Sequence, residues 1–191
     1  MNQKNRLSNN TKDYLSTFYC ILNDMIQSMT EAELGNSISY NFIVQMIPHH
    51  MAAIEMSKNV LKYTTNITLQ DIALQIIEEQ TKSIENMRSI LCTCEKRTNS
   101  RQDLYLYQRR TIQIMNIMFS KMENAKSTNN INANFIWEMI PHHKGAIAML
   151  KNALQYNICP ELTPILKSII TSQEKGVIEM QNLLQHIRCE D

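Results

Sequence analysis

Two copies of the pentapeptide Met-Ile-Pro-His-His are the residues in this sequence best suited to chemistry. They place the adjacent histidines His49 and His50 in the first half of the chain, and His142 and His143 in the second half. Imidazole nitrogen binds copper, zinc and iron, and thioether sulfur from methionine selects for soft ions. The pentapeptides therefore predict a metal site, with copper as the first expectation and zinc or iron as alternatives.

The pentapeptides belong to a longer internal repeat with a constant offset of 93 residues. Segment 41–63 aligns with segment 134–156 without a gap, and 15 of these 23 positions are identical. The same offset matches residues outside these segments, so we expect two helical repeats, 11–94 and 104–187. The polar stretch 95–103 would link them, and together they would form one bundle domain.

The two copies keep histidine and methionine but not carboxylates. Four of the five histidines and ten of the twelve methionines after Met1 are matched, whereas none of the 18 Asp and Glu residues lies opposite another. A di-iron bundle of the ferritin type needs carboxylates from several helices. The comparison therefore favours a soft-metal site of imidazole and thioether. The candidate ligands are His49, His50, His142, His143, Met46, Met56, Met139 and Met149.

Apolar residues at helical spacing predict three helices in each repeat. In the first repeat they span about 11–30 and 39–63, and the third begins near Thr68, where a capping box is expected. Pro48 predicts a bend or a restart within the second helix. The helix equivalent to the first spans about 103–124 in the second repeat. Helices with one apolar face pack together, so we expect an all-α, ferritin-like four-helix bundle with an additional helix preceding each core.

Helix geometry places the candidate ligands along one stripe of the second helix. Met46, His49 or His50, and Met56 recur at spacings of three or four residues. Neighbouring histidines point about 100° apart, so they need not bind the same ion, and the sequence leaves open one shared site or two. We expect the amide groups freed by Pro48 to keep the imidazoles neutral. Residues expected to support the ligands from the third helix are Gln80 and Met87, with their counterparts Gln173 and Met180.

A structural role must be weighed against metal binding for the methionines. Methionine at helical spacing usually packs in a core, and we expect that role for Met25, Met29, Met118 and Met122. For the four methionines beside the histidines, Met46, Met56, Met139 and Met149, the sequence does not separate core packing from metal ligation. Paired histidines retained as a block favour a ligand role.

Composition and charge bound the possible partners. The net charge is +1 and no dense basic run occurs, so no nucleic-acid partner is expected. No apolar run reaches the roughly 20 residues of a membrane span, and the polar residues 1–10 do not resemble a signal peptide. The sequence as given therefore predicts a cytoplasmic protein. The cysteines number five, which favours reduced and largely inert thiols over a disulfide framework.

The block F-x-x-x-M-I-P-H-H-x-x-A-I-x-M, followed by Q-x-x-x-[IV]-x-x-M, resembles the bacterial domain-of-unknown-function 305 family. The block runs from Phe42 to Met87 in the first copy and from Phe135 to Met180 in the second. The resemblance implies a ferritin-like core with two helices from each repeat, and it implies copper handling. Many members are exported, and many have Asp where this chain has Asn41 and Asn134. The helices outside that core would flank the bundle or form a homodimer surface.

We interpret the sequence as that of a non-catalytic metal-binding protein for sequestration or tolerance. One rival is a metal-dependent oxidoreductase or hydrolase, which needs an acid or base such as Glu55 or Glu138. A second rival is a structural or interaction module, in which the paired histidines only form hydrogen bonds across the core.

Overall fold

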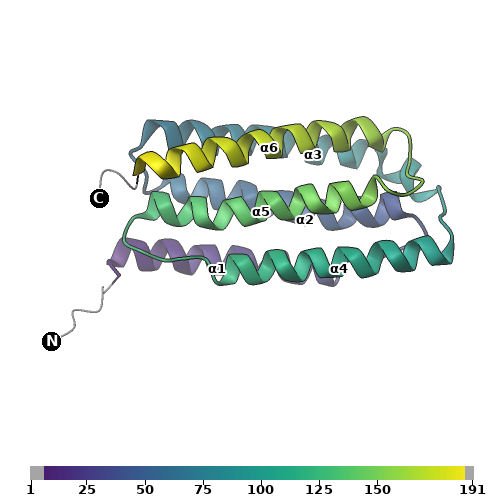
Figure 1. Ribbon diagram of the computed structural model, residues 1–191, viewed down its shortest axis with the longest axis horizontal. Coiled ribbons are helices and arrows are strands. Elements are labelled where there is room, and N and C mark those ends of the chain that lie inside the picture. Colours follow the sequence, from purple (N-terminus) through teal and green to yellow (C-terminus); the bar gives the residue numbers. More distant parts are fainter. Residues whose placement is uncertain (1–6, 188–191) are drawn as a thin grey trace.

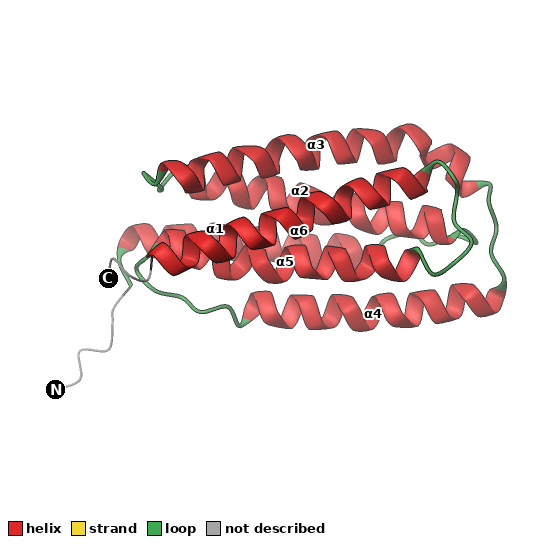
Figure 2. Cartoon of the chain, turned by 45° about the horizontal axis from the view of Figure 1, so that its top comes forward, coloured by secondary structure: helices red, strands yellow, loops and turns green. Residues whose placement is uncertain are grey.

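The computed structural model describes residues 7–187, which form six α-helices and no strand. The helices run along one common long axis (Figure 1), and short loops connect them (Figure 2). Their bounds are α1 (Asn9–Thr30), α2 (Ile38–Leu61), α3 (Ile67–Glu95), α4 (Arg101–Glu123), α5 (Ile131–Ala153) and α6 (Leu162–Ile187). The expected all-α fold with three helices from each half of the chain is confirmed.

The helices form three layers of two (Figure 1). Helices α3 and α6 make one outer layer, α2 and α5 the middle layer, and α1 and α4 the other outer layer. Contacts of α2 with α3, α5 with α6, α3 with α6, and α2 with α5 define a four-helix core. Helix α1 packs on α2, and α4 packs on α5. The two additional helices therefore flank the bundle, and the histidine-bearing helices lie at its centre.

Side-chain caps define where five of the helices begin. In each case the side chain of the capping residue accepts a hydrogen bond from a backbone N–H in the first turn, which leaves one fewer unpaired amide. The caps are Ser8, Ser37, Asn66, Ser100 and Asn130. The expected capping box at Thr68 is wrong. The Asn66 Oδ1 atom accepts from Leu69 N at 2.9 Å and places Thr68 inside the first turn of α3.

Helix α2 continues through Pro48, and α5 continues through Pro141, so the expected restart is not seen. Proline removes the hydrogen bond that residue 48 would donate to the carbonyl of Val44. Helix α2 lies between two layers, and its buried residues cover most of its circumference. Packing on both sides holds the helix together despite the missing bond. In α6, Pro164 lies in the first turn, where proline needs no N–H partner, and Pro160 precedes the helix.

The core is continuous through all three layers. The four methionines expected in the core, Met25, Met29, Met118 and Met122, are at most 2% exposed and pack in one apolar cluster. Within residues 7–187, no helix is both long enough and apolar enough to cross a membrane.

Candidate metal centre

The four predicted histidines meet where α2 and α5 pack against each other. The ring centroids of His49 and His142 are 3.6 Å apart, with 27° between the ring planes. Each of these rings is 5.9 Å from the ring of its neighbour in sequence, His50 or His143. Sequence spacing left open whether the two pairs lie together, and the structure brings them into one cluster in the middle layer.

The ring nitrogens in this cluster are buried and mostly without hydrogen-bond partners. All four histidines are at most 2% exposed. The Nε2 atom of His142 lies 3.1 Å from the backbone oxygen of His49. Six of the eight ring nitrogens make no regular hydrogen bond: both of His49, both of His50, and Nδ1 of His142 and His143. His49 and His143 have only weaker contacts, with the backbone of His142 and of Met139. Buried polar atoms are nearly always satisfied, so this concentration of unpaired nitrogens indicates a role beyond packing.

Burial keeps these imidazoles neutral. It lowers the pKa of His50 to about 3 and that of His142 to about 4, and the hydrogen bond to His49 opposes the shift at His142. Burial, together with repulsion from the other rings, also holds the pKa values of His49 and His143 well below 6.5. The expectation of neutral rings therefore holds, but desolvation is the main cause rather than the helix amides near Pro48. A neutral ring keeps a nitrogen lone pair available to a cation.

Two glutamines extend the cluster toward the outer layer of α3 and α6. Gln80 and Gln173 are each 2% exposed, and the Oε1 atom of each has no hydrogen-bond partner. Both line a cavity of about 220 Å³, whose wall also includes His50 and the exposed residues Lys82 and Asn86. The cavity therefore runs from the surface, between α3 and α6, to the His50 ring. Unpaired amide oxygens beside an unpaired imidazole make a polar pocket suited to a cation or to water.

The predicted methionines lie on the same helices as the histidines or on the adjoining outer layer. Met46 and Met56 are on α2, and Met139 and Met149 are on α5. Met87 and Met180, from α3 and α6, are 0% exposed. All six belong to the apolar core cluster. Core packing thus describes their present contacts, and metal ligation by their sulfur atoms stays a prediction.

Gly176, which the sequence analysis did not single out, leaves space for the His143 ring. A Cβ atom built on Gly176 of α6 would lie 3.2 Å from Cδ2 and Nε2 of the His143 ring. This separation is tight, so any side chain at position 176 would press on the imidazole. The matched position in α3 is Ser83, whose hydroxyl is buried without a partner and lines the cavity beside His50.

Glu138 is a buried acid that has no acidic counterpart in the first half of the chain, where the matched residue is Gln45. Its Oε2 atom accepts a 2.5 Å hydrogen bond from the Tyr14 hydroxyl of α1, and the glutamate is 2% exposed. Burial raises the pKa of Glu138 to about 8, while the bond from Tyr14 opposes that rise. The corresponding residues are Gln45 and Tyr107. The Gln45 Oε1 atom has no hydrogen-bond partner, and the Tyr107 hydroxyl contacts Thr111 of its own helix rather than an acid.

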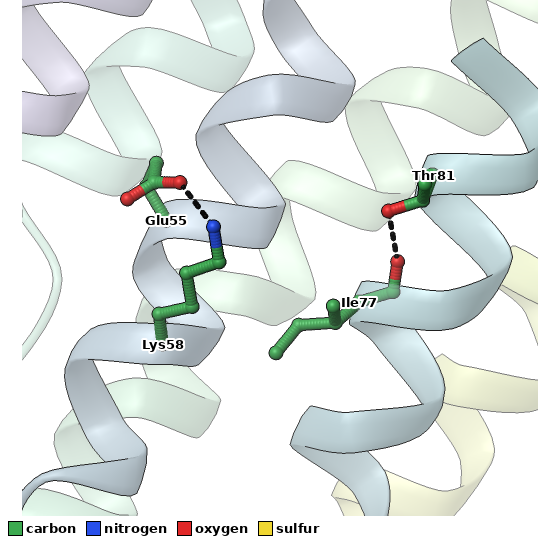
Figure 3. Close-up of polar contacts among 4 residues, drawn as sticks. All are labelled: Glu55, Lys58, Ile77 and Thr81. Atoms are coloured by element: carbon green, nitrogen blue, oxygen red, sulfur yellow. Dashed lines mark hydrogen bonds and ion pairs between the residues drawn. The ribbon is translucent and has the colours of Figure 1, made fainter. Parts of the chain in front are cut away.

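The other acid considered from the sequence, Glu55, lies at the surface. It forms a 2.8 Å ion pair with Lys58 (Figure 3), and both side chains are more than half exposed. The same view shows the Thr81 hydroxyl donating to the Ile77 carbonyl within α3. Thr81 follows Gln80 in sequence, but its hydroxyl bonds to its own helix. Of the two acids, Glu138 is therefore the buried candidate, one turn before His142 on α5.

The present arrangement sets limits on how an ion could bind. Among residues 7–187, no group of three or more His, Cys, Asp or Glu side chains has the geometry of a metal site. The stacked faces of His49 and His142 also leave no space between them. Imidazole lone pairs lie in the ring plane, so an ion would bind at the ring edges. A small number of nitrogen ligands, with methionine sulfur on the same helices, suits a soft ion of low coordination number better than it suits a hard ion.

Comparisons with known proteins bear on the family and the fold of this chain. The family model described as Domain of unknown function (DUF305) matches residues 39–184, which include all four histidines. CopM in a silver-bound form is 27% identical and has a TM-score of 0.58, with 78% of this chain and 95% of that chain covered. CopM in a Cu(II)-bound form is 26% identical, with a TM-score of 0.58 and coverage of 78% and 96%.

A further solved structure shows the same fold. A DUF305 fragment from Deinococcus radiodurans is 20% identical, with a TM-score of 0.57 and coverage of 78% of this chain and 96% of that chain. Among curated proteins, none matches this chain.

Proposed function

The chain belongs to the DUF305 family, and from that premise we propose that it binds copper through the buried histidine cluster and serves in copper sequestration or tolerance. The single observation that carries this proposal is the cluster of four buried imidazoles, six of whose ring nitrogens make no regular hydrogen bond. A purely structural histidine cluster would pair these atoms with backbone or side-chain groups. The proposal gains support from CopM, which is similar in fold and has copper-bound and silver-bound forms.

The residues present fit copper by their chemistry. The proposed ligands are His49, His50, His142 and His143, and the thioethers of Met46, Met56, Met139 and Met149 supply soft sulfur. Bound copper would be held rather than turned over, because the four histidine side chains are at most 2% exposed. Neutral nitrogen and sulfur ligands add no negative charge, which favours the singly charged Cu(I) over divalent ions.

The cavity between α3 and α6 gives the ion a route to the cluster. It reaches the surface near Lys82 and Asn86 and ends at His50. Gln80 and Gln173 offer unpaired carbonyl oxygens along this route. We propose that these glutamines hold an entering ion briefly and orient the His50 ring.

Metal titration tests the proposal. Purified protein is analysed for metal content and titrated with Cu(I), Cu(II), Zn(II) and Fe(II), alongside a variant with all four clustered histidines changed to glutamine. The fifth histidine, His186, is exposed and lies 2.8 Å from the Asn182 carbonyl, so His186→Gln is the matched control. Tight copper binding lost only in the four-histidine variant supports the proposal. Equal stoichiometry in all three proteins contradicts it.

A metal-dependent oxidoreductase is the second candidate, and one observation favours it. Glu138 is a buried acid on α5, one turn before His142, and its pKa of about 8 would let it carry a proton at neutral pH. Consumption of oxygen or peroxide by copper-loaded protein, lost in Glu138→Gln, would favour catalysis. If copper-loaded protein binds the full amount of metal but consumes neither oxygen nor peroxide, the result supports sequestration.

A further inference from the structure

Two cysteines from opposite halves of the chain meet at one end of the bundle. Cys94 lies at the end of α3, and Cys159 lies in the loop between α5 and α6. Their exposed fractions are 0% and 2%, and the thiol of Cys94 is within hydrogen-bonding reach of the thiol of Cys159. The odd number of cysteines predicted reduced and largely inert thiols, and it did not single out this pair.

The backbones of both cysteines are fixed to the first turn of α2. The Ser37 hydroxyl donates to the Cys94 carbonyl at 2.7 Å, and the Cys159 N–H donates to the Ser39 hydroxyl at 2.8 Å. Nearby, Asn99 donates to the Asn157 carbonyl at 2.8 Å and joins the α3–α4 linker to the same loop. These bonds hold the two thiols together without any covalent link between them.

The surroundings give the pair a proton acceptor at the protein surface. The Cys159 thiol donates to Glu161 Oε2 at 2.9 Å, and Glu161 is exposed. This hydrogen bond lowers the pKa of Glu161, so the side chain is a carboxylate at neutral pH. Burial holds the pKa of the Cys94 thiol above its usual range, so that thiol stays protonated. The pair is therefore a dithiol at rest.

We infer that Cys94 and Cys159 form a reversible disulfide that joins the two halves of the chain when a small peroxide is present. Cys159 attacks one peroxide oxygen, the O–O bond breaks, and the products are a sulfenic acid and water or an alcohol. The Glu161 carboxylate takes the thiol proton and passes it to the leaving oxygen. The Cys94 sulfur then attacks the Cys159 sulfur, and the S–O bond breaks with release of water, whose second proton comes from Cys94.

Among residues 7–187, this pair of neighbouring cysteines occurs once. The positions 93 residues away from the two cysteines are Ile187 and Asn66, which have no redox chemistry. The other described cysteines, Cys20 and Cys92, are exposed. The pair also lies at the bundle end near the first turn of α2, whereas the histidines lie near the middle of that helix. The cross-link would thus respond to oxidants independently of the histidine cluster.

Peroxide treatment of metal-free protein tests the inference. A variant with C20S, C92S and C189S retains only the pair, and after hydrogen peroxide its free thiols should fall from two to none. Peptide mapping should find one cross-linked peptide containing Cys94 and Cys159, and a thiol reductant should restore both thiols. The cross-link should raise the melting temperature by roughly 5–10 °C, because it closes a long loop.

Matched variants separate this outcome from nonspecific oxidation. The C94S/C159S protein should form no intramolecular cross-link under the same conditions. If serine variants fold poorly, peptide mapping of the wild-type chain gives the same information. Two thiols that stay free in folded, peroxide-treated protein would overturn the inference, as would cross-links that join Cys94 to Cys92 or to a second molecule.

Discussion

The imidazole rings of His49 and His142 stack with their centroids 3.6 Å apart, although 93 residues separate them in sequence. The two rings occupy matched places in the two halves of the chain, so their contact marks where the halves meet. Across this contact, the His142 Nε2 atom lies 3.1 Å from the backbone oxygen of His49. The remaining nitrogens of both rings are buried and unpaired. The centre of the protein is therefore a cluster of ligand-type atoms rather than a satisfied polar network.

Acid should destabilise the protein through this cluster. The folded state holds the pKa of His50 near 3 and that of His142 near 4, whereas an exposed imidazole titrates near 6.5. The unfolded chain therefore binds more protons below pH 6.5, and stability is complete above that pH and falls as the pH drops toward 4. We expect a loss of about 2 kcal/mol per ring at pH 5. Urea unfolding from pH 7.5 to pH 4.5 measures this slope, which His50→Gln should reduce and His186→Gln should not.

The acid Glu138 should have the opposite pH dependence. Its pKa is about 8 in the folded protein and near 4.5 when exposed, so the folded state binds the extra proton between these values. Stability is therefore lost as the pH rises through that window, by on the order of 3 kcal/mol between pH 4.5 and pH 7. Glu138→Gln, which copies its counterpart Gln45, should raise the melting temperature at pH 8 and change it little at pH 4.5. An equal shift at both pH values would contradict the assigned protonation.

Copper affinity should depend little on pH near neutrality. The clustered imidazoles are already neutral at pH 6, because burial lowers their pKa values far below that. Metal binding then displaces no proton from them, unlike binding at exposed histidines. Competition titrations at pH 6, 7 and 8 should give affinities within about threefold of one another. A tenfold rise per pH unit would indicate ligands that are protonated in the metal-free protein.

Methionine substitution separates ligation from packing. Met46→Leu with Met139→Leu nearly conserves core volume, so the cost in stability should stay below about 1.5 kcal/mol per site. We expect Cu(I) affinity to fall at least about tenfold, a loss of about 1.4 kcal/mol of binding free energy, with little change for Zn(II). The matched control is Met25→Leu with Met118→Leu, at core positions of α1 and α4. Equal Cu(I) affinity in both double variants would assign Met46 and Met139 to packing alone.

Local rules predicted most of the helices but not how the halves meet. Hydrophobic spacing and capping residues act within a few positions, and they gave helix bounds mostly within about two residues of the structure. They failed at Thr68, where Asn66 caps the helix instead, and at Pro48, where packing on two sides outweighs the lost hydrogen bond. The internal repeat identified the histidines because duplication compares two copies in one chain.

The remaining features of the site depend on long-range contacts. The bond between Tyr14 and Glu138 spans 124 positions, and the room that Gly176 leaves for His143 depends on how α5 and α6 approach each other. Neither has a sequence motif. The absence of a counterpart for Glu138 was visible, but its burial could be learned only from the arrangement of the helices.

Anomalous diffraction at the copper edge, from crystals grown with Cu(I) under reducing conditions, tests the central claim most directly. The account predicts a strong peak inside the bundle, at the ring edges of the clustered histidines between α2 and α5, and no such peak for the four-histidine variant. A copper peak confined to the surface, with the four rings still stacked and free of metal, would contradict it.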